Sequence, residues 1–420
     1  MINLIKQLSG PTNKDLRKRI YYTLFALLVF SIGTAIVRIG AKNLTSELSF
    51  WQLASLNTGG SIKPHSIFGL GVMPYISASI IMQLLQSDIV PYFKDLKEQG
   101  YVGRQKLNVI TRYMGIFFAF LQGYAFSMYF MKDASPDMIV KSTVVLTAGT
   151  AFLLWLGDQI TKKGIGNGIS LIIMAGILNT MPGMFITVFK ELITNTGASL
   201  GGILGFSGFV LIYLIIIVGI IWVQLAERRI PIQYSNRTTS AYGAQQSYLP
   251  IKLNSAGVVP VIFASSILSF PGLIAGFLNN KGFTEFVEKY LTYTEPVGLA
   301  IYVLLIIIFG YFYTIMQMKP DEMAKNLNQN GGYIPGIRPG NDTEDFITKI
   351  LNRLSIFGTL FIIIIAVIPI IFSKFSNLPT SVTIGGTGLL IVVGIAIETY
   401  KQLESSIVSR SYKTKRRSRR

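Results

Sequence analysis

Residues able to do acid–base, nucleophilic or metal chemistry are scarce in this chain. It contains no cysteine and a single histidine, His65, so it has no thiolate and no histidine-based metal site. The glycine-rich run Gly164–Gly168 lacks the Gly-Lys-Ser/Thr ending of a phosphate-binding loop. Asp158 and Glu398 lie near the ends of apolar runs rather than in their middles. We therefore expect a protein with no catalytic residues, no metal and no cofactor, which is not an enzyme.

The composition indicates a protein that lies in a membrane. Of the 420 residues, 50% are hydrophobic and 14% are charged, whereas soluble domains carry about 25% charged residues. A membrane-spanning helix needs roughly 20 apolar residues, and apolar runs of this kind recur along the chain. The predicted spans are 20–39, 71–86, 110–131, 142–160, 168–188, 206–224, 255–277, 296–317, 355–373 and 381–398.

The second predicted span is short and begins with the run Gly71–Ser79, which places a proline at a helix start among small hydroxyl residues. Helices that are broken at membrane depth are tolerated where they line a cavity or pack inside protein. The preceding region, 44–70, is apolar but is interrupted by Gly59, Gly60 and Pro64. We interpret it as a re-entrant segment, and we expect the chain to surround a pathway.

Positive charge is distributed unevenly between the two sides of this arrangement. The N-terminal arm, the tail and every second connection, together with Arg112 at the start of the third span, hold 29 of the 38 lysines and arginines. Cytoplasmic loops carry the excess of positive charge, so both termini are predicted to be cytoplasmic. The net charge of +18 also favours anionic partners.

Several long motifs occur in an order that identifies a family. Together they resemble the SecY family of protein-conducting channels along nearly the whole chain. The motifs are Ser66–Leu85, Gly164–Ser170, Glu227–Tyr234 with Tyr248–Ser266, Asn326–Gly340 and Gly385–Val393.

This resemblance implies an all-α polytopic membrane protein, with about ten transmembrane helices in two pseudo-symmetric halves of five around a central pore. The expected parts are a cytoplasmic arm 1–19, an N-terminal half 20–188 with its plug at about 44–70, a C-terminal half 189–398 with cytoplasmic loops 225–254 and 318–354, and a basic tail 399–420. Its expected function is to pass unfolded secretory polypeptides across the bacterial cytoplasmic membrane and to release membrane segments laterally into lipid. The alternative from another class is an ion-coupled secondary transporter of a small solute, which needs a mid-span ionisable residue.

The resemblance also implies partners. They are the small membrane subunits SecE and SecG, the motor ATPase SecA, the ribosome through its RNA and proteins, the signal sequences of substrate polypeptides, and anionic lipids. The basic run 410–420 is interpreted as a disordered, solvated tail near anionic lipid, with occasional contact to RNA.

Two sets of residues are expected to seal the channel. An apolar ring dewets when it is empty and so blocks ions. The spacing supports this, because Ile76/Ile80 and Ile173/Ile177 are i,i+4 pairs that each share a helix face; lipid-facing or packing isoleucines remain the alternative. The resemblance places the ring at Ile76, Ile80, Ile173, Ile177, Ile262 and Ile391. It places the plug at Phe50, Trp51, Leu53, Gly59 and Gly60, with an interfacial loop as the alternative.

The resemblance also implies a lateral gate between spans two and seven, with help from spans three and eight. Pro74 and Pro260 each remove a backbone donor and are expected to weaken helix rigidity there. Gln83 and Asn254 are expected to hydrogen-bond across the closed gate, at about 0.6 kcal/mol per contact. For Asn254, polarity at a helix end near the headgroups is an equal alternative.

The resemblance implies that the cytoplasmic loops form the docking surface for the ribosome and the motor. Arg338 is predicted to lie at the tip of a turn that its flanking glycines and prolines fix, and arginine forks recognise carboxylate and phosphate. For Arg228 and Arg229, a role as positive membrane anchors remains the alternative. The expected docking residues are Arg228, Arg229, Arg237 and Arg338.

Overall fold

The computed structural model describes most of the chain, in nine stretches. These are residues 14–38, 66–86, 90–131, 135–194, 200–234, 247–278, 281–292, 295–375 and 385–417.

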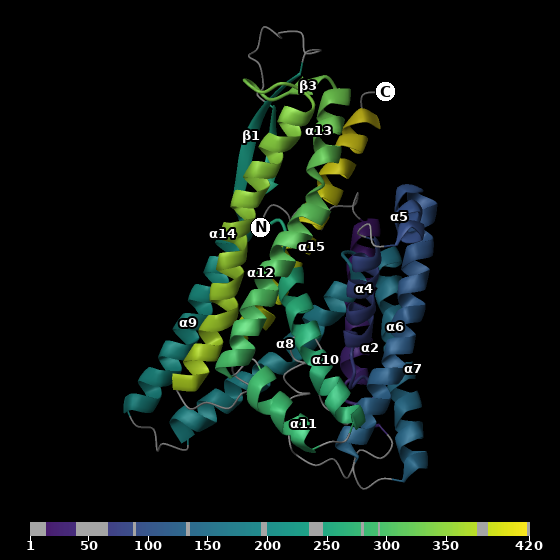
Figure 1. Cartoon of the computed structure of the whole chain (residues 1–420), viewed down its shortest axis with the longest axis vertical. Helices are drawn as coiled ribbons and strands as arrows, with labels where there is room; N and C mark the ends of the chain where they lie inside the picture. The colour runs from purple at the N-terminus through teal and green to yellow at the C-terminus, as the bar shows by residue number, and fades with distance from the viewer. Residues whose placement is uncertain are drawn as a thin grey trace.

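Each of the ten predicted spans overlaps a helix in the described part of the chain (Figure 1). Six helices are long and apolar enough to cross a membrane, and the apolar stretches Met73–Leu84 and Val259–Gly272 are shorter. The ten helices are α2 (Lys14–Gly33), α4 (Met73–Leu84), α6 (Tyr101–Phe130), α7 (Pro136–Lys163), α8 (Gly168–Phe189), α9 (Leu200–Leu225), α10 (Val259–Leu278), α12 (Pro296–Met318), α14 (Asn341–Phe375) and α15 (Gly385–Arg417).

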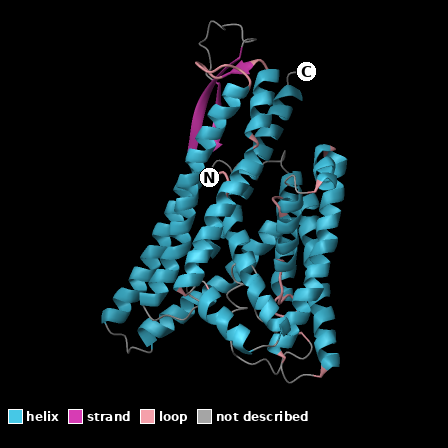
Figure 2. Cartoon of the chain, in the orientation of Figure 1, coloured by secondary structure: helices cyan, strands magenta, loops and turns pink. Residues whose placement is uncertain are grey.

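Shorter elements connect these helices. The short helices are α5 (Pro91–Glu98), α11 (Lys281–Phe286) and α13 (Pro320–Gln329), with π-helical turns η4 (Lys190–Thr194) and η5 (Val287–Leu291). The strands β1 (Glu227–Tyr234), β2 (Ser247–Lys252) and β3 (Gly332–Tyr333) form one antiparallel sheet in the order β2-β1-β3. Figure 2 shows these strands together at one end of a molecule that is otherwise built of helices.

A single large apolar core joins the two halves of the chain. It draws buried side chains from α2, α4, α7 and α8 in the first half and from α9, α10, α12, α14 and α15 in the second. The halves are therefore packed against each other through shared apolar contacts, which are the dominant stabilising term in folding.

The residues on either side of 39–65 lie next to each other. Val37 and Ser66 form an antiparallel β-bridge, and the Ile67 amide donates to the Ile36 carbonyl at 3.1 Å. A Cβ added to Gly33 would lie 2.1 Å from the Phe68 ring, so only glycine allows this approach. The predicted plug residues Phe50, Trp51, Leu53, Gly59 and Gly60 fall outside the described residues.

The segments expected as cytoplasmic loops contain more regular structure than the sequence analysis predicted. We call residues 227–234, 247–252 and 320–351 the protruding unit. Its apolar side chains form their own core, in which Ile230 and Ile251 of the hairpin meet Leu327 of α13 and Ile347 of α14. Two segments far apart in sequence thus fold into one body.

The expectation of a disordered basic tail is wrong for most of its length. Helix α15 continues past the predicted end of the tenth span to Arg417. Figure 1 shows its yellow end reaching the same end of the molecule as β1, β3 and α13.

Candidate functional site

Four helices bring the six predicted ring residues into one buried apolar cluster. Helices α4 and α8 each supply an i,i+4 pair, whereas α10 and α15 each supply one residue. The exposed fraction of these side chains runs from 0% for Ile391 to 9% for Ile262. The six are Ile76, Ile80, Ile173, Ile177, Ile262 and Ile391, and all belong to the core shared by both halves.

The helices approach closely at this cluster. A Cβ added to Gly388 of α15 would lie 3.0 Å from the Cγ2 atom of Ile177, so α15 packs directly on α8 about one turn from Ile391. A constriction lined by branched apolar side chains offers water no hydrogen bonds and excludes it. It also offers no directional contact that selects among the chains passing through it.

The two predicted gate prolines begin their helices rather than weaken them. Pro74 lies in the first turn of α4, and Pro260 is the second residue of α10. The missing N–H costs nothing there, since the first amides of a helix have no intrahelical partner. The interior proline of α10 is Pro271, whose missing donor does interrupt the ladder of hydrogen bonds.

The predicted hydrogen bonds across the gate are also wrong. Gln83 donates to Ser79 on its own helix at 3.2 Å. Asn254 lies in the turn before α10, where its Nδ2 donates to the Gly257 carbonyl at 3.0 Å. Its Cα lies 3.3 Å from the position of a Cβ added to Gly358, so Asn254 packs on α14 and does not face α4.

Buried polar side chains occur on α4, α6 and α10, three helices that pack against one another. Gln122 of α6 donates to the Ser77 hydroxyl of α4 over 3.4 Å. The Oε1 atoms of Gln83 and Gln122 and the Oγ atom of Ser266 on α10 are buried and have no hydrogen-bond partner among the described residues. Sequence reasoning missed Gln122, Ser77 and Ser266, since a polar residue in an apolar run does not say which helix it faces.

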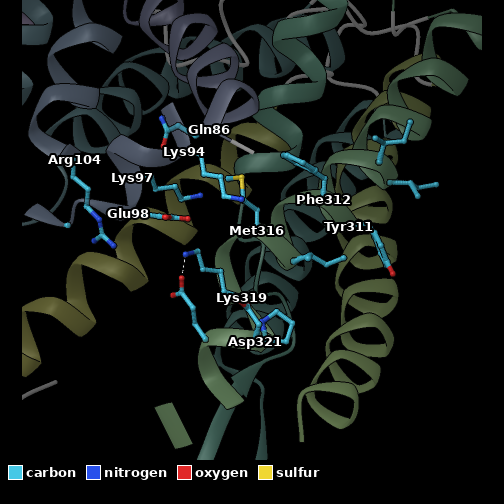
Figure 3. Close-up of a pocket in the computed structure, with 16 residues that line it drawn as sticks. Gln86, Lys94, Lys97, Glu98, Arg104, Tyr311, Phe312, Met316, Lys319 and Asp321 are labelled. Atoms are coloured by element: carbon cyan, nitrogen blue, oxygen red, sulfur yellow. Dashed lines mark hydrogen bonds and ion pairs between the residues drawn. The ribbon is translucent and has the colours of Figure 1, made fainter. Parts of the chain in front are cut away.

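A crevice separates the first half from the second near one end of these helices (Figure 3). It has a volume of about 1140 Å³, and the apolar side chains of α12, including Tyr311, Phe312 and Met316, form one wall. Lys94, Lys97 and Arg104 line the other wall, on α5 and the start of α6. The chain thus has an amphipathic opening between its halves.

The protruding unit presents its arginines to solvent. Arg228 and Arg229 are exposed on β1, where the Arg229 guanidinium lies 4.9 Å from the Tyr248 ring centroid. Arg338 is exposed in the predicted turn, between Gly336 and Gly340, whose φ angles are 82° and 105°. The Thr343 hydroxyl donates to the Arg338 carbonyl at 2.8 Å and fixes that turn. Arg237 lies outside the described residues.

Of the two acidic residues considered for ion coupling, one is paired with an arginine and the other is exposed. Asp158 of α7 accepts a hydrogen bond from Arg112 of α6 at 2.6 Å and forms an ion pair with it. Glu398 is exposed. Neither is the unpaired mid-span acid of an ion-coupled site. No cluster of metal-ligating residues occurs in the part of the chain that the structure describes.

Solved structures with this fold are protein-conducting channels. A structure described as a protein-conducting channel matches with a TM-score of 0.70 and 20% sequence identity, covering 94% of this chain and 93% of that one. Sec61 in the canine ribosome-channel complex from the endoplasmic reticulum matches with a TM-score of 0.67 and 19% identity, covering 94% and 93%. This chain therefore has the fold of these channel structures.

Sequence comparisons identify the family within that class. The SecY family model matches residues 66–400. Curated relatives named protein translocase subunit SecY are 46% identical in Halalkalibacterium halodurans and 45% identical in Bacillus subtilis, each over 95% of this chain and 96% of the relative. The chain belongs to the SecY family. It is a protein-conducting channel subunit and a multi-pass membrane protein, in a family that is not enzymatic, and the comparisons do not support the secondary-transporter alternative.

Proposed function

We propose that the chain passes unfolded secretory polypeptides through the six-isoleucine cluster and releases apolar segments laterally into lipid between α4 and α10. The observation that carries this proposal is that both halves contribute buried isoleucines to one shared apolar core. A constriction built from both halves widens when the halves separate and closes when they meet. Its apolar lining seals the empty channel and does not select among sequences.

The buried polar atoms carried by α4, α6 and α10 support lateral opening at this place. A buried polar atom without a hydrogen-bond partner carries a desolvation penalty. The free energy of packing is therefore less favourable for helices that hold such atoms. Separation of α4 from α10 exposes the Ser266 hydroxyl and the Gln83 carbonyl oxygen to new partners. Signal sequences are the proposed trigger, and the crevice beside α12 is their proposed entrance.

The protruding unit is the proposed docking surface for the ribosome and for the motor ATPase SecA. Exposed arginines offer forks of donors that match phosphate and carboxylate. Support for the ribosome comes from two similar structures, the canine Sec61 channel and the yeast Ssh1 complex, which are described as bound to ribosomes. Arg237 is included with Arg228, Arg229 and Arg338 in this proposal.

The proposed seal includes the plug at about 44–70. A similar structure, matching with a TM-score of 0.69 at 20% identity, is described as showing that the plug domain of SecY stabilises the closed state and maintains a membrane seal. In this chain Ser66, near the end of that region, forms a β-bridge with Val37, which precedes the region.

The proposed setting is a complex in the bacterial cytoplasmic membrane. The relatives are named as subunits of a translocase, which supports partners such as SecE and SecG. The uneven distribution of lysine and arginine supports cytoplasmic termini, a cytoplasmic protruding unit and proximity to anionic lipid. The proposed halves are 20–188 and 189–398, with the arm 1–19 and the tail 399–420 outside the membrane.

Site-specific photocrosslinking tests the pathway. A photoreactive amino acid at Ile391, which is 0% exposed, should crosslink to a stalled translocating chain. The same probe at Ile364, which is 47% exposed on α14, is the matched control and should crosslink to lipid. Crosslinking of the stalled chain at Ile364 but not at Ile391 would contradict the proposed path.

A further inference from the structure

The segment Thr399–Ile407 of α15 contacts both halves of the molecule. Lys401 lies 3.4 Å from Glu227, the first residue of β1 in the protruding unit. Glu227 is also paired in register with Lys252, at the base of the hairpin. This ion pair therefore joins α15 to the part of the protruding unit closest to the membrane-spanning helices.

The same segment packs on the first half through apolar side chains. Leu403 and Ile407 form a cluster with Leu16 and Ile20 of α2 and with Ile165, which lies between α7 and α8. Leu16 is 2% exposed and Ile407 is 5% exposed, so this contact excludes water.

A third contact lies one turn earlier along α15. Gly166 has a φ of +83°, and a Cβ added there would lie 3.3 Å from the Thr399 hydroxyl oxygen. The turn between α7 and α8 thus passes directly against α15.

Helix geometry assigns these contacts to two faces of α15. Residues 399, 403 and 407 are spaced by four and share one face, and that face meets the first half. Lys401 is two residues from Thr399 and from Leu403, so it points to the opposite side at 3.6 residues per turn. One helical segment thus stands between the protruding unit and the first half.

We propose that Thr399–Ile407 is a clasp, which couples the position of the protruding unit to the separation of the two halves. The inference rests on the proposed docking function, because the coupling matters when a partner binds the protruding unit. Leu403 and Ile407 hold the clasp to the first half, and Lys401 positions the hairpin through Glu227. Binding at the hairpin then shifts the distance between the halves.

Spin-label distances provide a readout that does not require transport. The chain has no cysteine, so cysteines introduced at Arg104 and Lys325, exposed in the first half and on α13, take the labels alone. The distance distribution is measured on the purified translocase complex in nanodiscs, with and without empty ribosomes. We expect ribosomes to shift the wild-type distribution.

The apolar side of the clasp is tested by L403A combined with I407A. We expect a broader distribution without ribosomes and a ribosome-induced shift reduced by at least half. The matched control is S405A, on an exposed position of the same helix, and it should behave as the wild type. If the double variant fails to assemble, L403V with I407V gives the same comparison with smaller cavities.

The polar side is tested by charge exchange. E227K and K401E should each reduce the ribosome-induced shift, and the two together should restore it. Misfolding of the single variants could not explain such a rescue. An unchanged ribosome-free distribution in both apolar double variants would overturn the clasp, as would a charge exchange that does not restore the shift. If the wild type binds no ribosome, the docking proposal fails, and the ribosome-free comparison still decides whether the clasp holds the halves.

Discussion

An isoleucine in a constriction and an isoleucine facing lipid have the same chemistry and differ in their surroundings. Ile391 is fully buried between helices, whereas Ile364 is 47% exposed in a span of similar composition. Spacing pairs residues on one helix, but only the packing of four helices brings the six together. Periodicity alone therefore does not select these six residues, and the resemblance to the family was needed to propose them.

The first prediction concerns the seal. I391N should raise the resting ion conductance of the complex several-fold, because an amide stabilises water where the isoleucines exclude it. Planar-bilayer recording, normalised to the amount of protein, measures this. The control I364N should instead lower abundance, since an unpaired amide in hydrocarbon costs about 2 kcal/mol or more. Low abundance without a leak in I391N would refute the ring at that position.

The second prediction concerns docking. R338E should reduce translocation at least about tenfold, because a hydrogen bond to a charged group contributes about 1.5–3 kcal/mol and 1.4 kcal/mol is a factor of ten. Abundance should stay normal, since the side chain is exposed. Transport into inverted vesicles measures the effect, with K325E on neighbouring α13 as the control. Normal transport by R338E would exclude this arginine from the docking contact.

At the scale of elements, the sequence predicted what local patterns determine. Hydropathy located a helix at each predicted span, but it did not predict that α14 begins 14 residues before its span or that α15 ends 19 residues after its span. Glycine and proline located the turn at Arg338. Contacts between distant segments were not predictable in this way. The sequence does not say that β3 pairs with β1, that α13 packs on the hairpin, or that Asn254 turns toward α14.

The third prediction concerns the gate between α4, α6 and α10. S266A removes a buried hydroxyl that has no partner among the described residues, so it should stabilise the closed gate by about 1 kcal/mol. Marginally apolar signal segments should then insert less often. The control S269A loses a hydroxyl that donates to the Ser265 carbonyl at 2.7 Å, and it should destabilise. Thermal unfolding in detergent and an insertion assay measure both; equal effects of the two variants would contradict this assignment.

At the scale of the whole molecule, two halves share one apolar core. The sequence carries little identity between the halves, so their joint packing had to come from the structure. The clasp also could not be predicted from the sequence, because it depends on residues from α2, the α7–α8 turn, α15 and β1.

The fourth prediction concerns orientation. Cysteines replacing Arg104 and Arg338 should be shielded from an impermeant thiol reagent in intact cells, and those replacing Lys141 and Lys281 should be labelled. The charge distribution is the reason, since cytoplasmic loops hold the excess of lysine and arginine. Permeabilised cells control for reactivity. Labelling of the Arg338 replacement from outside would place the protruding unit on the outer side of the membrane and disprove its docking role.

The brevity of α4 has a consequence for which helices must match the bilayer. Its 12 residues rise about 18 Å, whereas the hydrocarbon layer is about 30 Å thick. A helix that faces lipid must match that thickness or deform the bilayer, at a cost that grows with each ångström of mismatch. No residue of Met73–Leu84 is exposed, so α4 is covered by protein and is free of that requirement. Its neighbour α6, with 30 residues, is long enough to match the bilayer in its place.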